Sequence, residues 1–358
     1  MIIWILWSPA DKHDQEEEVK LRLLLFITAL TFSFSIPTAW AAEGSSSGEK
    51  RSTVTTAKAK AKAKAKAKAR QKARIKARIA KRAAYVHKIN HTPSAIEQLD
   101  DSFGGELRLA SAKALILNQE TGEVLYAKST DLPTPIASVT KLMTAMVVLD
   151  ARQSLDEMVT VTSADVDTLK GTSSRLPVGS TLTRAEMLQL ALMSSENRAA
   201  SALGHAYPGG YQAFISAMNV KAMMLGMTRT QFVDATGLNS GNISTAEDLA
   251  RMVNAAYEYP EIRQVSTAAS YAVEMNGMRR PAEFRNTNAL VRNSDWNIGL
   301  SKTGFINEAG RCLVMQALIA GQPLIIVLLD SAGKYTRIGD ANRVRKWIES
   351  NRLIAKMG

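Results

Sequence analysis

The sequence predicts an α/β (α+β) fold in which one antiparallel sheet, formed from both ends of the folded part, packs against a helical block. Three observations lead to this expectation. Two short strand patterns occur within residues 113–129, three more occur between residues 296 and 331, and helical periodicity fills much of the region between them. The composition allows such a fold, because 46% of the 358 residues are hydrophobic, enough for one large domain or two small ones.

The first strands come from KALILNQETGEVLYAKS, which predicts a pair joined by a turn around Glu120–Gly122. Helical periodicity then covers residues 141–151, 184–206, 211–225 and 245–257. Thr245, followed closely by two acidic residues, resembles a capped helix start. The last strands are predicted from WNIGLSKTGF, RCLVMQALIA and LIIVLLDS, and residues 341–350 predict a closing amphipathic helix.

An export signal is predicted at residues 1–41. Two basic residues precede an apolar stretch at 23–36, and the small residues of AWA predict cleavage before Ala42. An uncleaved membrane anchor is the alternative, but the apolar run is shorter than the roughly 20 residues that span a bilayer. Residues 1–18 contain an acidic cluster that does not suit export, so we expect translation to start near Val19.

The basic character of the chain is concentrated in one tract. The formal net charge is +12, yet 13 Lys and Arg and no Asp or Glu lie between Lys58 and Arg82, so 12 − 13 leaves −1 for everything else. Large apolar side chains are almost absent before Ile75, and such a segment cannot build a core. We therefore expect a largely disordered basic linker at 42–104, followed by one folded domain at 105–358.

Two roles for the tract stay open, namely a solvated spacer and an electrostatic contact of residues 57–82 with an anionic wall or envelope polymer. No nucleic acid is expected as a partner, because no aromatic side chain is interleaved before Tyr85 and an export signal precedes the tract. A mainly wall-binding, non-enzymatic protein is the corresponding alternative function.

The residue types present argue against several kinds of catalytic and binding site. The single cysteine, Cys312, rules out an intramolecular disulfide, and its apolar surroundings predict a buried core residue. Only His205 of the four histidines lies in the folded part, where it is expected at a helix end, so a Ser-His-Asp hydrolase is not predicted. No metal site, phosphate loop or cofactor is expected.

The segment PIASVTKLMTA places Ser138 and Lys141 one helical turn apart. Serine becomes a nucleophile when a base lies within hydrogen-bonding distance, and a deprotonated lysine can be that base. The same spacing occurs by chance at Ser47 and Ser331. Only Ser138 opens an apolar helical segment, after Pro135, where free N–H groups can stabilise an oxyanion.

Two further motifs follow in order. Ser195 and Asn197 form a Ser-x-Asn element, and Lys302–Gly304 forms a Lys-Thr-Gly element on a predicted strand. A second Ser-x-Asn begins at Ser240, so this piece alone carries little weight. Taken singly, these residues could be helix caps, loop residues or ordinary strand residues. The ordered triple is much less expected by chance.

This ordered set resembles that of the penicillin-binding proteins and class A β-lactamases. Longer segments, among them TGEVLYAKSTDLPTPIASVTKLMTA and WNIGLSKTGFINEAGRCLVMQAL, resemble the low-molecular-mass penicillin-binding proteins, most closely the D-alanyl-D-alanine endopeptidases of the penicillin-binding protein seven type. The resemblance extends from about Leu107 to the end and implies a DD-peptidase/β-lactamase-like fold.

The resemblance also implies catalytic roles. Ser138 would attack the carbonyl of a D-alanyl peptide bond, with Lys141 as the proton acceptor. Ser195 would relay a proton to the leaving amine, and Asn197 would orient the substrate amide or Lys141.

Four residues around the Lys-Thr-Gly element are implied in substrate binding. Lys302 would supply positive charge that lowers the pKa of the catalytic lysine and serine and attracts a substrate carboxylate. Thr303 would hydrogen-bond the substrate, and Gly304 would let the strand approach closely. The backbone N–H groups of Ser138 and Phe305 would form the oxyanion hole.

The implied function is a periplasmic serine D,D-endopeptidase that cuts cross-links between peptidoglycan stem peptides and is acylated and inhibited by β-lactam antibiotics. The alternatives are a D-alanyl-D-alanine carboxypeptidase and, less favoured, a β-lactamase. A β-lactamase must deacylate fast, which in class A requires a downstream glutamate, and none occurs between Glu196 and Glu247. About 54 residues follow Gly304, so no C-terminal anchor beyond a short helix is expected, and apolar Phe305 weakly favours a large substrate.

Overall fold

A computed structural model describes residues 106–275 and 280–357 of the chain. The predicted signal segment, with its alternative start, and the predicted linker lie outside the described residues. Within the described part, no helix combines the length and the apolar character needed to cross a membrane.

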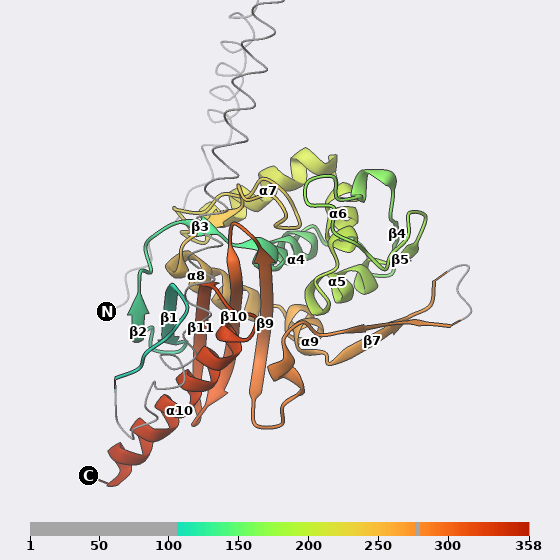
Figure 1. Cartoon of the computed structure of the whole chain (residues 1–358). Coiled ribbons are helices and arrows are strands. Elements are labelled where there is room, and N and C mark those ends of the chain that lie inside the picture. The colour runs from blue at the N-terminus through green and yellow to red at the C-terminus, as the bar shows by residue number, and fades with distance from the viewer. Residues whose placement is uncertain (1–105, 276–279, 358) are drawn as a thin grey trace, which may run out of the picture. The chain divides into compact units, whose positions relative to one another are not determined.

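The main sheet has five antiparallel strands in the order β2-β1-β11-β10-β9 (Figure 1). Its strands are β1 (Lys113–Asn118), β2 (Val124–Lys128), β9 (Asn297–Ile306), β10 (Gly310–Ile319) and β11 (Gln322–Ser331). The two edges, β2 and β9, therefore come from opposite ends of the folded part. The predicted fold class is confirmed in its central feature, and so are the five predicted strands.

The middle strand β11 is buried on both faces of the sheet. Its residues alternate between two cores: Leu324, Ile326 and Leu328 face one, while Ile325, Val327 and Leu329 face the other. A strand covered on both faces has no need of polar alternation, which explains the continuous apolar run LIIVLL. The sheet is thus the middle of three layers.

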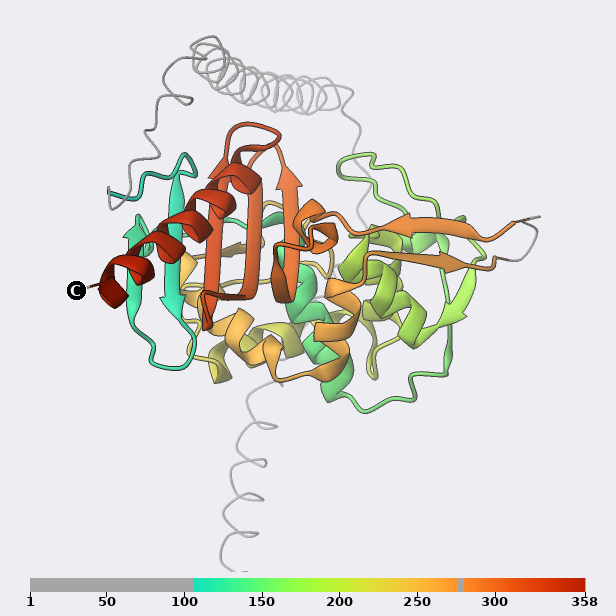
Figure 2. The same ribbon diagram turned by 90° about the horizontal axis from the view of Figure 1, so that it is seen from below.

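One outer layer is α10 (Thr336–Met357), which lies across one face of the sheet (Figure 2). Its buried side chains Ala341, Val344 and Ile348 belong to the core on that face. The helix begins five residues before the predicted start at residue 341. The hydroxyl of Thr336 accepts the backbone N–H of Gly333 at 3.1 Å and fixes the entry into the helix.

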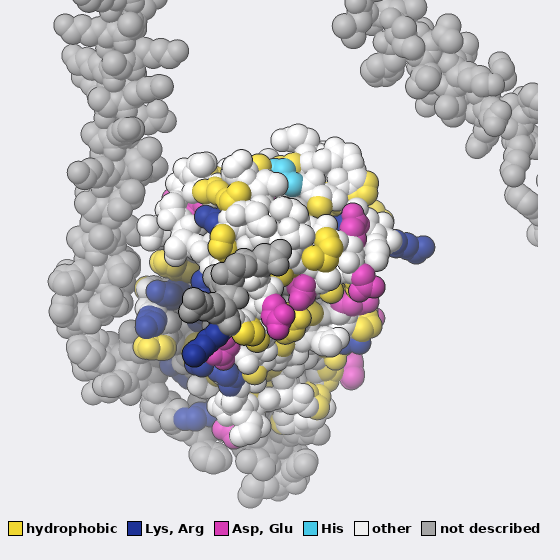
Figure 3. All heavy atoms as spheres, turned by 90° about the vertical axis from the view of Figure 1, so that its right-hand side faces the viewer, with side chains coloured by type: hydrophobic (Ala, Val, Ile, Leu, Met, Phe, Trp, Pro, Cys, Tyr) yellow, Lys and Arg dark blue, Asp and Glu magenta, His cyan; other side chains and the backbone are white. Residues whose placement is uncertain are grey.

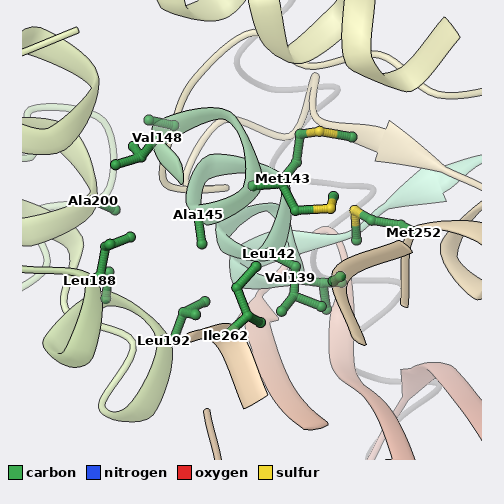
Figure 4. Close-up of a cluster of buried hydrophobic side chains, with 14 of the residues drawn as sticks. Val139, Leu142, Met143, Ala145, Val148, Leu188, Leu192, Ala200, Met252 and Ile262 are labelled. Atoms are coloured by element: carbon green, nitrogen blue, oxygen red, sulfur yellow. The ribbon is translucent and has the colours of Figure 1, made fainter. Parts of the chain in front are cut away.

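The other layer is a helical block on the opposite face. It contains α4 (Lys141–Asp150), α5 (Arg184–Met193), α6 (Asn197–His205), α7 (Gly210–Met224), α8 (Ala246–Tyr257) and α9 (Pro260–Thr267). The first eight residues of α4 are all buried, so this helix forms the centre of the block. Figure 4 shows its apolar side chains packed against residues of α5, α6, α8 and α9.

The prediction of one helix over residues 184–206 is wrong, because the chain forms two helices there. The hydroxyl of Ser194 bonds to the carbonyl of Leu190 at 2.8 Å, and the N–H of Glu196 reaches the same carbonyl at 3.1 Å. Ser195 between them adopts a φ of 62°, which turns the chain out of the helix. The prediction of a capped start at Thr245 is confirmed, since its hydroxyl accepts the N–H of Asp248.

Several short elements were not predicted. One is the eight-residue helix α9. The others are β3 (Thr134–Pro135) paired with β6 (Ile243–Ser244), β4 (Met158–Thr160) paired with β5 (Thr181–Thr183), β7 (Ser270–Val273) paired with β8 (Ala282–Arg285), and the 3-10 turns η1 (Ala137–Thr140), η2 (Ser163–Asp165) and η3 (Ala289–Arg292). Strands of two to four residues are too short to show a periodicity.

Cys312 is fully buried in β10, as predicted, and this burial raises the pKa of its thiol to about 11. A protonated, buried thiol is a poor nucleophile. On the face of the helical block in Figure 3, apolar side chains are scattered among polar ones, which is the ordinary surface of a globular domain.

Candidate active site

Ser138 lies in η1, the turn that joins β3 to α4. The preceding Ala137 has a φ of 49°, a left-handed conformation that residues with a Cβ atom rarely adopt and that is typical of functional sites. A Cβ atom at Gly304 would lie 2.9 Å from the carbonyl oxygen of Ile136 and 3.1 Å from the backbone nitrogen of Ser138. Glycine at 304 therefore allows β9 to approach the turn closely. The alternative that Ser138 caps the helix is wrong, because neither η1 nor α4 has a side-chain cap bond.

Lys141 is the first residue of α4, and its side chain is completely buried. Its Nζ atom lies 2.9 Å from the hydroxyl oxygen of Ser138, 2.8 Å from Oδ1 of Asn197 and 2.7 Å from the carbonyl oxygen of Thr236. The structure thus brings together three residues that the sequence singled out. Thr236 was not singled out, because it acts through its backbone, which has no signature in the sequence.

The pKa of Lys141 is lowered to about 7, chiefly because burial penalises the charged ammonium group. Asp234 and Glu196 act in the opposite direction and limit the shift. At neutral pH a large fraction of this amine is therefore deprotonated and can accept a proton.

The second pair of predicted residues meets between β9 and the turn that joins α5 to α6. Lys302 of β9 places its Nζ atom 2.9 Å from the hydroxyl oxygen of Ser195 and 2.8 Å from the carbonyl oxygen of Thr303. The pKa of Lys302 is well below its usual value, first because of burial and then because of the positive charges of Lys141 and Arg337. The expectation that the charge of Lys302 lowers the pKa of Lys141 is not supported, because burial is the largest cause of that shift and Lys302 is not among its causes.

The remaining predicted residues lie along the same edge strand. The hydroxyl of Thr303 donates to the hydroxyl oxygen of Thr287 at 2.7 Å, and Phe305 is 50% exposed at the rim. The guanidinium of Arg311 on β10 lies over the ring of Phe305, 4.4 Å from its centre. Arg337 of α10 donates to the carbonyl of Gly304 at 2.9 Å and so holds the strand in place.

A loop between η2 and β5 closes one side of the site. Its Thr172 hydroxyl oxygen accepts a hydrogen bond from Nδ2 of Asn197 at 3.1 Å. Two residues earlier, the ammonium of Lys170 lies 2.6 Å from a carboxylate oxygen of Glu308, just beyond the end of β9. Two contacts therefore join β9 and the residue just beyond it to the other side of the site, namely the buried pair of Lys302 and Ser195 and the partly exposed ion pair of Lys170 and Glu308.

His205 ends α6, as predicted, and lies beside an acid and a serine. Its Nδ1 atom is 2.9 Å from Oδ1 of the buried Asp165, and the hydroxyl of Ser201 donates to the same oxygen at 2.7 Å. In a catalytic triad the imidazole stands between the acid and the serine. Here both residues bind the carboxylate directly, so the cluster is a structural cap.

Comparison with known proteins gives consistent matches. The family model of D-alanyl-D-alanine carboxypeptidase matches residues 101–333. A D-alanyl-D-alanine endopeptidase of Pseudomonas aeruginosa is 50% identical over 247 residues, which are 69% of this chain and 80% of that protein. The Escherichia coli protein of the same name is 50% identical over 246 residues, 69% of this chain and 79% of its own. A D-alanyl-D-alanine carboxypeptidase of a Streptomyces species is 32% identical over 254 residues, 67% of this chain and 87% of its own.

Solved structures agree. The Streptomyces K15 DD-transpeptidase superposes with a TM-score of 0.64 at 30% identity, covering 68% of this chain and 98% of its own. Penicillin-binding protein D2 of Listeria monocytogenes, solved with ampicillin bound, superposes with a TM-score of 0.58 at 30% identity and covers 69% of this chain and 98% of its own.

Proposed function

The chain belongs to the D-alanyl-D-alanine carboxypeptidase family of serine peptidases, and on this premise we propose that Ser138 and Lys141 are its nucleophile and general base. The enzyme is a serine D,D-endopeptidase that hydrolyses D-alanyl cross-links between peptidoglycan stem peptides. The observation that carries the assignment of residues is the contact of the buried Lys141 amine with the Ser138 hydroxyl at 2.9 Å.

Acylation follows from the geometry. The neutral amine of Lys141 accepts the hydroxyl proton of Ser138 while the Ser138 oxygen bonds to the D-alanyl carbonyl carbon. The carbonyl oxygen becomes an oxyanion, to which the backbone N–H groups of Ser138 and Phe305 donate. The close packing of Gly304 on the backbone of Ser138 supports this pairing, because Phe305 is the next residue.

The leaving amine needs a proton when its bond to the carbonyl carbon breaks. Ser195 is suited to relay it, since its hydroxyl contacts Lys302 and it stands two residues from Asn197, which contacts Lys141. The products are the free amine and an ester on Ser138. Once the leaving amine has taken up the proton and Lys141 is neutral again, water attacks the ester and Lys141 accepts a proton from it. The bond between the Ser138 oxygen and the acyl carbon then breaks, the stem peptide leaves with a free carboxyl group, and Lys141 returns the proton to the Ser138 oxygen.

The preference for cross-links is supported by two relatives that are 50% identical and are both named endopeptidases, whereas relatives near 30% identity are named carboxypeptidases. β-Lactams, which carry a reactive acyl group, are the expected inhibitors, and a relative was solved with ampicillin bound. The half-exposed ring of Phe305 offers apolar surface to a long substrate.

The test is to incubate the purified protein separately with cross-linked muropeptide dimers and with monomeric pentapeptide, following the products by mass. Dimers should be cut to monomers, with little D-alanine released from pentapeptide. Rapid loss of D-alanine beside intact dimers would instead identify a carboxypeptidase. Ser138→Ala serves as the inactive control for both substrates.

We propose further that the protein is exported to the periplasm, with the signal at 1–41 removed, and that the basic tract at 57–82 contacts an anionic wall polymer. The tract carries its charge without acidic neighbours, so binding should weaken as salt is raised. Replacing its Lys and Arg by Gln should reduce sedimentation with purified sacculi at low salt and leave soluble-substrate turnover unchanged. Binding that ignores both salt and these replacements would contradict the contact, and intact mass would show whether the mature chain starts at Ala42.

A further inference from the structure

The loop beside the active site is organised by one carboxylate, that of Asp167. One of its oxygens accepts the backbone N–H groups of Leu169 at 2.8 Å and Lys170 at 2.9 Å. The other accepts the N–H of Thr172 at 2.8 Å and the Thr172 hydroxyl at 2.7 Å. Partial burial opposes ionisation, but the hydrogen bonds from Lys170 and Thr172 outweigh it and lower the pKa of Asp167. The group is therefore an ionised acceptor at neutral pH.

This carboxylate determines the direction of the next hydrogen bond. An ionised carboxylate can only accept, so the hydroxyl proton of Thr172 is committed to Asp167. The Thr172 oxygen then has only lone pairs to offer to Asn197, whose side-chain nitrogen lies 3.1 Å away. Asn197 must therefore turn its NH₂ group to Thr172 and its oxygen to Lys141.

The orientation of Asn197 decides where the lone pair of Lys141 points. A neutral amine has two N–H donors and one lone pair, and Lys141 has three neighbours. The carbonyl of Thr236 and the oriented oxygen of Asn197 can only accept, so they take both protons. The lone pair is left facing the hydroxyl of Ser138.

We propose that Thr172 is a positioning residue that, by fixing the amide of Asn197, directs the lone pair of Lys141 at Ser138. The inference rests on the proposed roles of Ser138 and Lys141. Thr172 itself touches neither reacting atom. It contributes by fixing the donor-to-acceptor direction of the hydrogen bonds that run from Asp167 to Lys141.

The test compares Thr172→Val, which removes the hydroxyl at constant shape, with Thr172→Ser, which keeps it. Thr160→Val is the matched control, since the Thr160 hydroxyl pairs with the hydroxyl of Thr181 on the surface of β4 and β5, 2.9 Å away. Acylation by a labelled penicillin is followed in each purified full-length protein from pH 5 to 9, with binding and acylation rates separated by concentration dependence.

Thr172→Val should slow the acylation step about tenfold or more with little change in binding, because the freed amide can turn NH₂ toward Lys141 and misdirect its lone pair. An ammonium that loses this acceptor is also less favoured, so the acidic limb of the pH profile should move to lower pH. A slower enzyme with a more easily deprotonated base is the expected signature. Thr172→Ser should restore both the acylation rate and the position of the acidic limb.

Three results would overturn the proposal. The first is a Thr172→Ser protein that is acylated as slowly as Thr172→Val. The second is a Thr172→Val protein whose acylation rate falls by the same factor at every pH, with no shift of the acidic limb. The third is a Thr172→Val protein that is indistinguishable from wild type. None of these affects the proposed function, which fails only if wild-type Ser138 is not the labelled residue. If Thr172→Val does not fold, Thr172→Ala replaces it, since it also removes the hydroxyl that fixes the amide of Asn197 and should give the same shift.

Discussion

The Nζ atom of Lys141 lies 2.9 Å from the hydroxyl oxygen of Ser138, in surroundings that exclude water from the lysine completely. This burial is what lowers the pKa of Lys141 to about 7. A lowered pKa means that the active, neutral base is lost as the pH falls through that value. Acylation should therefore be constant above about pH 8 and roughly 100-fold slower at pH 5.

The measurement is the second-order rate constant for labelling by penicillin across this range, on protein shown to stay folded at each pH. A lysine with its ordinary pKa near 10.5 would instead give a rate that still rises steeply between pH 8 and 10. That profile would show that Lys141 is charged in the resting enzyme.

Ser138→Ala should abolish penicillin labelling and hydrolysis while leaving the fold intact. The hydroxyl caps no helix, and Lys141 keeps its contacts with Asn197 and Thr236, so the expected stability change is less than about 1 kcal/mol. Intact mass after incubation with a penicillin should show one adduct per wild-type chain and none on the variant. Residual labelling above a few per cent would point to another serine.

Lys302→Met should lower the acylation rate without lowering the stability of the folded protein. The lysine is buried and its pKa lies well below the usual value, so its charged form destabilises the folded state at neutral pH. Met fills the same space without that penalty, but it cannot donate to Ser195. We expect acylation to fall about 100-fold or more while the melting temperature stays equal or rises.

Thermal unfolding and penicillin labelling of the same preparation check this prediction, with Lys113→Met, at the start of β1, as the control. Two outcomes argue against it. One is a large loss of stability, which would make Lys302 a structural residue. The other is a change in substrate binding with an unchanged acylation rate, which would reduce Lys302 to a carboxylate ligand.

The ion pair of Lys170 and Glu308, 2.6 Å apart, joins the loop beside the site to the residue three positions after Phe305. We expect a peptide that continues past Phe305 to displace this ion pair and a small substrate to leave it closed. Lys170→Met should therefore raise kcat/KM for cross-linked dimers several-fold and leave a small depsipeptide unaffected. The stability effect should be below about 1 kcal/mol, because the pair is partly exposed.

The dependence of dimer cleavage on salt concentration gives a second test that needs no mutation. Raising the ionic strength weakens exposed pairs, so it should accelerate dimer cleavage by the wild type and have less effect on the variant. Equal effects on both substrates in Lys170→Met would remove any role of the ion pair in substrate choice. A loss of dimer cleavage would show that Lys170 binds the substrate instead.

Most of the sheet could be predicted from the sequence, because apolar strands such as LIIVLL and RCLVMQALIA carry a local signal that tertiary packing reinforces. The break between α5 and α6 could not. The helical pattern continues through it, and the chain leaves the helix because Ser194 and Glu196 share the carbonyl of Leu190 and Ser195 turns left-handed. Those hydrogen bonds and that backbone angle depend on the folded chain and leave no pattern in the sequence.

The eight residues singled out could be named because the residue types of the three motifs stand at fixed spacings, and Phe305 directly follows the last motif. The residues that support them could not. Thr236 contributes a backbone carbonyl, and Thr172 reaches Asn197 from 25 positions earlier in the chain. Neither a carbonyl nor a distant hydroxyl leaves a pattern that a single sequence can reveal.

Gly237 offers a test of how closely the site is packed. It follows Thr236, whose carbonyl accepts from Lys141, and its φ is 80°, in the left-handed region that favours glycine. A Cβ atom there would lie 1.9 Å from the carbonyl oxygen of Ala137. Gly237→Ala must therefore displace either the loop or the turn that carries Ser138, because backbone atoms cannot yield as a flexible side chain can.

Gly226→Ala is the matched control, since Gly226 has a φ of 70° and nothing lies within 4 Å of the position that a Cβ atom would take there. Both variants carry the backbone penalty of about 1–2 kcal/mol for alanine in this conformation, and only Gly237→Ala adds the collision. We expect Gly237→Ala to lose more stability than the control and nearly all penicillin labelling, while Gly226→Ala keeps its labelling. Urea unfolding and labelling measure the two effects, and equal behaviour of the two variants would mean that the contact between the Thr236–Gly237 loop and the Ser138 turn does not hold the base in place.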